Sequence, residues 1–353
     1  MEAIREEIAA HGPIPFERFM ELALYGPGGF FATENLRSVA AGDFLTSPEV
    51  SPLFGATLAR FVAAERERIG EPFQVIDLGA GSGSLLTSLL VEFPVEAWAV
   101  EASPAARLAL ASVVRSERVL TSIADLPSPI RGVVIANELV DNLPTALAQP
   151  TDAGWRERWV GMEGEKFVFV DAPVRPDVLR WLEKFAGPVG IDGWVECQLE
   201  ASHWLRMVLS RVEAGAVLII DYGELAENLA HRRADGTLRT YRAHHLGPHP
   251  LDEPGATDIT SDVNFSALLA ICEEAGWECE LMRQDDFLNL WGLGDRLRDL
   301  RSQELGAAGA DENYRLELRS RRTAGETLLH ERGLGDFRVL IARPGNSLRP
   351  GYV

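Results

Sequence analysis

A glycine-rich turn between an apolar strand and a helix constrains the fold of this chain more than any other sequence feature. The segment VIDLGAGSGSLL ends a predicted strand at Asp77, and the turn that follows contains Gly79, Gly81 and Gly83. Glycine allows a left-handed backbone and lets a ligand approach without meeting a Cβ. Glu101 ends the next predicted strand, where a carboxylate can accept both hydroxyls of a ribose. Together these features predict a site for an adenosine-containing cofactor.

Strands and helices alternate around this turn. Seven short apolar segments predict strands, at 73–79, 96–101, 118–121, 132–137, 216–221, 277–282 and 337–342. Predicted helices lie between several of them, at 84–93, 103–114, 201–212 and 262–276. Continuous apolar strands that alternate with helices are typical of a parallel sheet covered on both faces. We therefore predict an α/β fold.

The alternation divides the chain into a helical N-terminal extension at 1–70 and an α/β domain at 71–353. We predict that the last helix of the extension runs from about residue 46 to Arg68, with Pro48 in its first turn.

Two insertions lengthen the α/β domain, at about 144–213 and 223–260. They follow the fourth and fifth strands, at the carboxyl edge of the sheet where ligands bind in such folds. The first contains two alternating runs around a glycine at 155–170, which predict a β-hairpin.

The charge balance disfavours several classes of partner. The 353 residues carry 53 acidic and 34 basic side chains, a formal net charge of −19. Nucleic acid and anionic membrane surfaces are repelled by such a chain, whereas a cationic partner such as an arginine-rich protein is attracted. The acidic charge can equally serve solubility alone. No apolar stretch has the length of a membrane span and the N-terminus MEAIREEIAAHG is not a leader peptide, so we predict a cytoplasmic protein without membrane insertion.

Metal and disulfide chemistry have little support in the sequence. Cys197, Cys272 and Cys279 form no CxxC pair and have no histidines at zinc-finger spacing. The neighbouring His244, His245 and His249 could suggest a metal, but no carboxylate completes a ligand pattern around them. We expect no metal.

The choice of cofactor follows from the residues around the turn. The dinucleotide fingerprint GxGxxG would require glycine at Ser84, and about 70 residues precede the turn, unlike a usual NAD domain. Asp77 would repel a pyrophosphate but suits the ammonium of S-adenosylmethionine. The pattern favours S-adenosylmethionine, with an NAD-dependent oxidoreductase as the weaker alternative.

Two other segments carry chemistry. GDFLTSPEVSPLFG at 42–55 places small and hydroxyl residues before a helix, which is typical of an anion-binding helix start and equally of a simple N-cap. ANELVDNLP follows the fourth strand, and its Glu138 and Asp141 are three residues apart. Both side chains would face the site if the segment turns helically; otherwise one is a cap and the other is solvated.

The ordered motifs resemble a known family. GDFLTSPEVSPLFG, VIDLGAGSGSLL, NELVDNLP, GWRERWV, IIDYGE and PGATDITSDVNFSAL occur in the order found in the MidA-like (DUF185) family of class I S-adenosylmethionine-dependent methyltransferases. The resemblance covers roughly residues 12–345. It implies a Rossmann-like, seven-stranded, mostly parallel sheet with a helical N-terminal extension and insertions after strands 4 and 5.

The resemblance also implies site residues. Those implied for the cofactor are Asp43, Thr46, Ser47, Pro48, Asp77, Gly79, Gly81, Gly83, Glu101 and Asn137, the first four within an N-terminal lid. Those implied for catalysis at the acceptor are Glu138, Asp141, Asp221 and Tyr222. His244 and Asp258 are implied to bind the substrate.

The activity implied by the family is methylation of an accessible arginine in a protein substrate, a complex I-type subunit. Departures from the family pattern concern the acceptor: Phe30 and Phe31 stand where the family has two tyrosines, and Ala146 and Leu147 lie where it often has a histidine-containing run. They motivate the alternative of a cofactor-binding assembly protein without turnover. The residues leave mono- versus dimethylation and the oligomeric state open.

Overall fold

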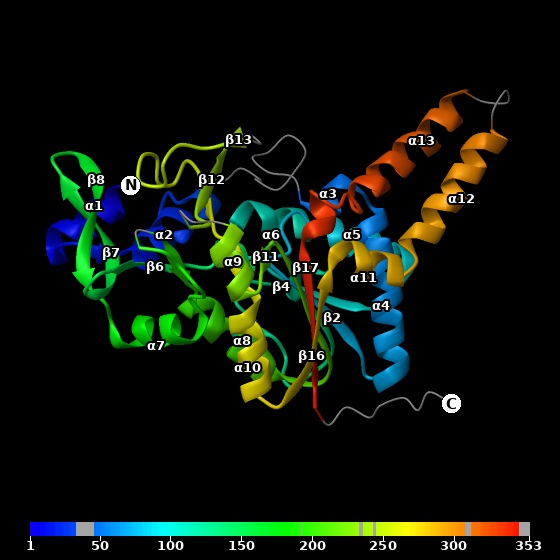
Figure 1. Ribbon diagram of the computed structural model, residues 1–353. Helices are drawn as coiled ribbons and strands as arrows, with labels where there is room; N and C mark the ends of the chain where they lie inside the picture. Colours follow the sequence, from blue (N-terminus) through cyan, green and yellow to red (C-terminus); the bar gives the residue numbers. More distant parts are fainter. Residues whose placement is uncertain (33–45, 192, 233–235, 243–244, 308–311, 346–353) are drawn as a thin grey trace.

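The central element of the computed structural model is a seven-stranded sheet (Figure 1). The structure describes residues 1–32, 46–191, 193–232, 236–242, 245–307 and 312–345. Across the sheet the strand order is β16–β17–β10–β5–β2–β3–β4. The strands are β2 (Gln74–Leu78), β3 (Glu96–Val100), β4 (Val119–Leu120), β5 (Ile130–Asn137), β10 (Val212–Asp221), β16 (Trp277–Arg283) and β17 (Arg338–Pro344). All seven predicted strands are confirmed, and β17 alone among them runs antiparallel to its neighbours.

The central strand β5 shows why the sequence forms a sheet buried on both faces. Its apolar run alternates between two cores: Val133 and Ile135 belong to one hydrophobic cluster, whereas Val134 and Ala136 belong to another. Successive strand side chains point to opposite faces, so a continuous apolar run requires cover on both sides.

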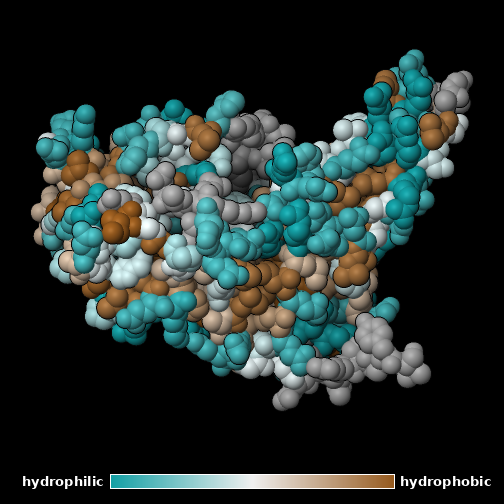
Figure 2. Space-filling view, in the orientation of Figure 1, coloured by the Kyte–Doolittle hydropathy of each residue, from teal (hydrophilic) through white to brown (hydrophobic). Residues whose placement is uncertain are grey.

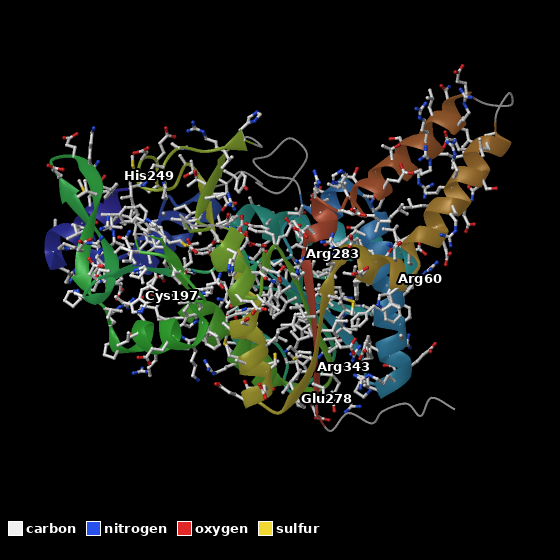
Figure 3. The ribbon with its side chains drawn as sticks, viewed as in Figure 1. Arg60, Cys197, His249, Glu278, Arg283 and Arg343 are labelled. Carbon is white, nitrogen blue, oxygen red and sulfur yellow. The ribbon has the colours of Figure 1, made fainter. Side chains whose placement is uncertain are left out.

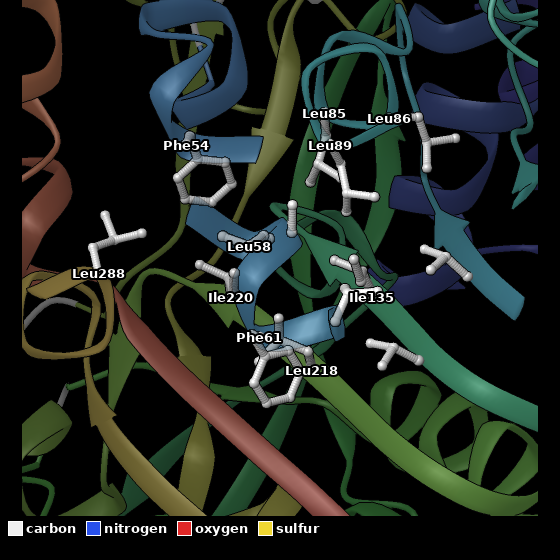
Figure 4. Packing of buried hydrophobic residues seen from close by; sticks show 14 of the residues in the cluster. Phe54, Leu58, Phe61, Leu85, Leu86, Leu89, Ile135, Leu218, Ile220 and Leu288 are labelled. Atoms are coloured by element: carbon white, nitrogen blue, oxygen red, sulfur yellow. The ribbon is translucent and has the colours of Figure 1, made fainter. Parts of the chain in front are cut away.

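Helices supply that cover. The first face packs against α4 (Leu53–Ile69) and α5 (Ser84–Glu92), and the second against α8 (Leu199–Arg211) and α10 (Phe265–Glu274). Figure 4 shows Ile135 and Leu218 of the sheet beside Phe61 of α4. The shorter α6 (Pro104–Leu110) follows β3 and has its N-cap at Ser103.

The helix predicted from about residue 46 to Arg68 is broken. The structure has a short α3 (Ser47–Val50), then extended backbone at Ser51 with φ −155° and ψ 131°, and then α4. The proline at position 52 explains the break, because a residue that precedes proline is disfavoured in the helical region.

The first part of the N-terminal extension, up to α2, and the first insertion form a second, smaller layer, at the left of Figure 1. Its antiparallel sheet contains β1 (Ile14–Pro15), β6 (Ala146–Thr151), β7 (Gly154–Glu163), β8 (Lys166–Pro173) and β9 (Val195–Cys197). The predicted hairpin is present as β7 and β8. Residues of α1 (Glu2–His11) and α2 (Phe16–Tyr25) are buried against this layer, and α7 (Pro176–Phe185) also packs on it.

The second insertion contains short elements close to the carboxyl ends of β5 and β10. They are β11 (Gly223–Glu224), α9 (Ala226–Arg232), β12 (Arg239–Arg242), β13 (His245–Leu246), β14 (Asp258–Thr260) and β15 (Val263–Asn264). The backbone N–H of Ser261 donates to the carbonyl oxygen of Asp141 at 3.0 Å, which joins this insertion to the segment after β5.

A pair of long helices between β16 and β17 has no counterpart among the sequence predictions. After α11 (Gln284–Leu290), α12 (Leu293–Gly306) and α13 (Glu312–Thr327) pack on each other and project from the body (Figure 1), with a largely hydrophilic surface (Figure 2). Neither these helices nor any other helix in the described part of the chain is long and apolar enough to cross a bilayer.

Two strands of the sheet approach each other closely at the end that is remote from the turn glycines. A Cβ on Gly132 of β5, where φ is +149°, would lie 1.8 Å from the carbonyl oxygen of Gln74 in β2. We expect Gly132→Ala to lower the free energy of unfolding by about 2–4 kcal/mol, because the backbone must move.

Urea unfolding measures this change, and Gly306→Ala is the matched control. Gly306 ends α12 with nothing within 4 Å of a built Cβ. Its substitution should leave stability unchanged or raise it by about 0.5–1 kcal/mol. A Gly132→Ala protein as stable as the parent would contradict the strand-packing argument.

Candidate functional site

A cavity of about 280 Å³ lies at the carboxyl ends of β3, β2 and β5, with residues of the N-terminal extension on its other side. This is the sheet edge at which α/β folds bind ligands. Eight of the residues predicted for the site line the cavity: Thr46, Pro48, Asp77, Gly79, Gly81, Glu101, Asn137 and Glu138. Ser47, Gly83, Asp141, Asp221, Tyr222 and Asp258 are outside the lining, and Asp43 and His244 fall outside the described residues.

The glycine turn has the backbone that its sequence predicts. Gly79, Gly81 and Gly83 all have positive φ, at 71°, 52° and 84°. At Gly79 an added Cβ would also lie 2.9 Å from Cδ1 of Leu139, so both conformation and space require glycine there.

Glu101 is held at the cavity by backbone donors. The N–H of Gly81 donates to its Oε2 at 2.8 Å, and the N–H of Ser103 donates to its Oε1 at 2.7 Å. Burial raises the pKa of Glu101, whereas these backbone hydrogen bonds and the guanidinium of Arg107 oppose that rise. The carboxylate is therefore fixed in place with lone pairs left for hydroxyl donors.

Asp77 is a buried carboxyl group with one oxygen that lacks a partner. Its Oδ2 makes no hydrogen bond within the described part of the chain. Burial, and to a smaller degree the charge of Glu101, raises the pKa of Asp77 to about 8. An unpaired buried carboxylate is costly, so the site is suited to a cationic ligand group that would pair with Asp77.

Glu138 has a strained backbone and a partly buried side chain. Its φ of 51° is the only positive value at a non-glycine residue in the described part of the chain. Its Oε1 accepts hydrogen bonds from the N–H of Ser47 at 2.9 Å and from Nδ2 of Asn137 at 3.2 Å. Burial raises the pKa of Glu138 to about 8. Residues held in such a conformation are common at functional sites.

Asp221 and Tyr222 brace the segment after β5. Oδ2 of Asp221 accepts from the N–H of Val140 at 2.9 Å and from that of Asp141 at 3.2 Å, and its Oδ1 accepts from the N–H of Tyr222 at 2.9 Å. The hydroxyl of Tyr222 donates to Asp141. Burial raises the pKa of the carboxyl groups of Asp141 and Asp221. These bonds fix the turn that presents Glu138.

The sequence analysis missed Glu49, which lines the cavity and joins α3 to the glycine turn. The hydroxyls of Ser82 and Ser84 both donate to its carboxylate, Ser84 at 2.7 Å. Ser84, which excludes the dinucleotide fingerprint, and its neighbour Ser82 thus use their hydroxyls to join the turn to α3. A carboxylate in the first turn after the Thr46–Ser47 cap was the available signal.

Other cavity residues were also missed. Thr121, Ser122, Ile123 and Trp204 line it beyond β3 and β4, and Tyr25, Phe31, Asn142 and Leu143 line it beyond β5. Trp204 comes from α8 and Tyr25 from α2, far from the glycine turn in sequence. No local pattern marks them, because they reach the cavity only through tertiary packing.

The remaining chemical candidates lie elsewhere. Figure 3 shows Cys197 in the smaller layer and His249, from the second insertion, beside that layer, where its ring packs edge-on against Phe169 with ring centroids 5.5 Å apart. Asp258 accepts from Nδ2 of Asn142 at 2.8 Å. Within the described ranges, no group of three or more His, Cys, Asp or Glu side chains is placed to hold a metal ion.

Comparison with known proteins gives a family match and a close likeness to solved structures. Residues 57–282 match the family described as "Putative S-adenosyl-L-methionine-dependent methyltransferase". A crystal structure of a Burkholderia thailandensis protein bound to S-adenosyl-homocysteine is 31% identical, with a TM-score of 0.83 over 98% of this chain and 91% of that chain. The predicted fold class and the predicted cofactor, S-adenosylmethionine, are thereby confirmed.

Named relatives are more distant in sequence. The human protein called "Protein arginine methyltransferase NDUFAF7, mitochondrial" is 28% identical over 83% of this chain and 73% of its own length. The Drosophila melanogaster homologue is 28% identical over 77% of this chain and 70% of its own length. Both names specify mitochondria, so the prediction of a cytoplasmic location, which rested on the absence of a visible leader, is wrong by this comparison.

The raised pKa of Asp77 generates a prediction about cofactor binding. A pKa of about 8 leaves this carboxyl mostly protonated at pH 7, whereas pairing with an ammonium requires its ionised form. Binding of S-adenosylhomocysteine should therefore release about one proton at pH 7, and its affinity should rise about tenfold per pH unit up to about pH 8.

Calorimetry in two buffers of different ionisation enthalpy measures the released proton. Asp77→Asn keeps the shape of the side chain, so it should weaken binding and flatten the pH dependence. An unchanged pH slope in Asp77→Asn would assign the linked proton to another group.

Proposed function

Because the chain belongs to the family of S-adenosyl-L-methionine-dependent methyltransferases, we propose that it transfers the methyl group to an arginine side chain of a protein substrate. The observation that carries this proposal is Glu138. It is a partly buried carboxyl just after β5 that lines the cavity, and desolvation raises its pKa to about 8. A guanidinium has a pKa above about 12, so it requires a carboxylate that orients it and accepts its proton.

The cofactor is assigned to the part of the cavity between β4 and β5. Glu101 would accept the ribose hydroxyls, Asp77 would pair with the ammonium, and Gly79 and Gly81 would let the methionine portion approach the backbone. The residues fit the group because the orphaned Oδ2 of Asp77 gains a partner. Thr46 and Pro48 would complete the wall on the N-terminal side.

The reaction needs alignment more than activation. The bound cofactor supplies a methyl group on a positively charged sulfur. The acceptor nitrogen of arginine forms a bond to that methyl while the carbon–sulfur bond breaks, and the sulfur leaves as a neutral thioether. Glu138 takes the proton that the guanidinium loses. Asp141, Asp221 and Tyr222 act as positioning residues, because their hydrogen bonds fix the turn that presents Glu138.

The class of substrate has two supports. The relatives in human and fly are named protein arginine methyltransferases, and the chain's net charge of −19 favours a cationic protein partner. The family resemblance supplies a complex I-type subunit as the first substrate to test.

Labelled methyl transfer tests the proposal. Incubation with methyl-labelled S-adenosylmethionine and a lysate lacking the gene should label arginine in one or a few proteins, identified by mass spectrometry. Glu138→Gln should lower the labelling rate by about 10²-fold or more, because the amide cannot accept the proton. Its affinity for S-adenosylhomocysteine should change little.

Glu278→Gln is the control for this experiment. Glu278 lies near the start of β16, the opposite edge of the sheet from β4, and Figure 3 shows it far from the labelled Arg283 at the other end of that strand. Its substitution should leave labelling unchanged. Full activity in Glu138→Gln would remove Glu138 from the mechanism, and labelling of residues other than arginine would overturn the proposed acceptor.

The pH profile provides an independent prediction. With the cofactor saturating, kcat/KM for the arginine acceptor should rise with pH while Glu138 ionises and should level off above about pH 8. The sign follows because the ionised carboxylate is the form that pairs with a guanidinium and accepts its proton. Initial rates between pH 6 and 9 measure the profile. A flat profile would show that no carboxyl of raised pKa is needed.

A further inference from the structure

Two aromatic rings close the cavity beyond Glu138, and we call them the aromatic wall. Tyr25 is the last residue of α2, and Phe31 lies in the short helix η1 (Phe30–Ala32). Both residues line the cavity. Their rings stack with centroids 5.5 Å apart and an angle of 21° between the planes. Stacking of this kind fixes both rings in one orientation.

Hydrogen bonds tie the aromatic wall to the β5 end of the cavity. The hydroxyl of Tyr25 donates to the carbonyl oxygen of Asn142 at 3.2 Å, in η4 (Val140–Asn142). Nδ2 of Asn142 donates in turn to Oδ1 of Asp258 at 2.8 Å and to the carbonyl oxygen of Ile259 at 3.1 Å. Asp258, which the family resemblance implies to bind substrate, therefore accepts a hydrogen bond from Asn142. The carbonyl oxygen of the same Asn142 accepts the hydrogen bond from Tyr25.

Along the sheet edge, the aromatic wall lies apart from the residues that are assigned to the adenosine portion of the cofactor. Thr121, Ser122 and Ile123 line the cavity after β4, and Glu101 lines it after β3. The strand order β4–β3–β2–β5 then places the segment after β5 at the other end of the edge. With the ribose held at Glu101, as proposed above, the transferred methyl group would lie toward β5. The wall therefore lies where the acceptor would enter.

The charges around the wall favour a cation. Burial raises the pKa of Tyr25, and the carboxylates of Asp258, Asp141 and Glu101 raise it further, because they disfavour a phenolate. The same negative surroundings stabilise a positive charge placed against the ring. Glu138 lines the same cavity and adds a carboxyl that can accept N–H donors.

We propose that the aromatic wall of Tyr25 and Phe31 binds the guanidinium of the acceptor arginine by face-to-face stacking, while Glu138 accepts its N–H groups. The inference rests on the proposed arginine acceptor and adds the residues that select it. A guanidinium is planar and weakly hydrated, so it stacks on a ring at less desolvation cost than the compact ammonium of lysine. The wall thus selects arginine over lysine.

Binding of small cations tests the wall without a known protein substrate. Methylguanidinium is titrated into the full chain saturated with S-adenosylhomocysteine, and its Kd is measured by ligand-observed NMR, with methylammonium as the comparison ion. The parent should bind methylguanidinium more tightly than methylammonium. Phe31→Leu should weaken methylguanidinium binding about 5- to 10-fold, because it removes the ring but keeps an apolar side chain of similar size. Phe31→Tyr should retain binding.

The controls separate a wall from a merely structural role. Phe167 packs edge-on against Phe19 in the smaller layer, with centroids 5.6 Å apart, and Phe167→Leu should lower the melting temperature without a change in methylguanidinium affinity. Affinity for S-adenosylhomocysteine should stay within about twofold in Phe31→Leu. A parallel loss of S-adenosylhomocysteine binding would assign the ring to the cofactor and overturn the inference, as would unchanged methylguanidinium binding.

The wall and the proposed function fail in different ways. Arginine labelling by the parent together with unchanged cation binding in Phe31→Leu would overturn the wall alone. Guanidinium binding that depends on Phe31, in a protein that labels no arginine, would overturn the proposed reaction and leave the guanidinium site in place.

Discussion

The burial of several carboxyl groups at one edge of the sheet is the constraint on which the rest of this structure depends. Asp77, Glu101 and Asp221 are buried at the carboxyl ends of strands, and Glu138 is partly buried there. Isolated buried carboxylates are strongly unfavourable, so each must be protonated, hydrogen-bonded or paired with a cation. Backbone N–H groups donate hydrogen bonds to the carboxylates of Glu101 and Asp221. Asp77, in contrast, keeps an oxygen without a partner in the described part of the chain. Asp77 is therefore suited to pairing with a positively charged ligand group.

This arrangement exchanges stability for binding. A carboxyl whose pKa is raised by folding holds its proton at neutral pH. Its contribution to stability is lost as the pH rises from the pKa of the unfolded chain to the pKa of the folded protein. For Asp77 and Glu138 that interval runs from about 4 to about 8. A cationic ligand that pairs with either ionised carboxylate stabilises the folded protein. The pairing offsets the stability that is lost when the carboxyl ionises. Ligand affinity and the stability of the free protein thus depend on the same groups.

The smaller layer positions residues of the N-terminal extension at the cavity. Buried apolar side chains of α1 and α2 pack on the sheet formed by the first insertion, and α2 ends at Tyr25 beside the cavity. Further along the extension, the N–H of Ser47 donates to Glu138. An insertion that was predicted only as a hairpin therefore supports the N-terminal segment that contacts the cavity.

The sequence by itself determined the seven strands, the positive-φ glycine turn and the place of Glu101, because apolar periodicity and glycine chemistry act over a few neighbouring residues. Tertiary structure alone decided that Ser47 donates to Glu138 across 91 positions and that Tyr25 donates to Asn142 across 117. It also decided that α12 and α13 project from the body and that Asp221 holds backbone N–H groups. Such contacts join residues from separate elements, so they exist only after the layers have packed, and no local pattern in the chain encodes their geometry.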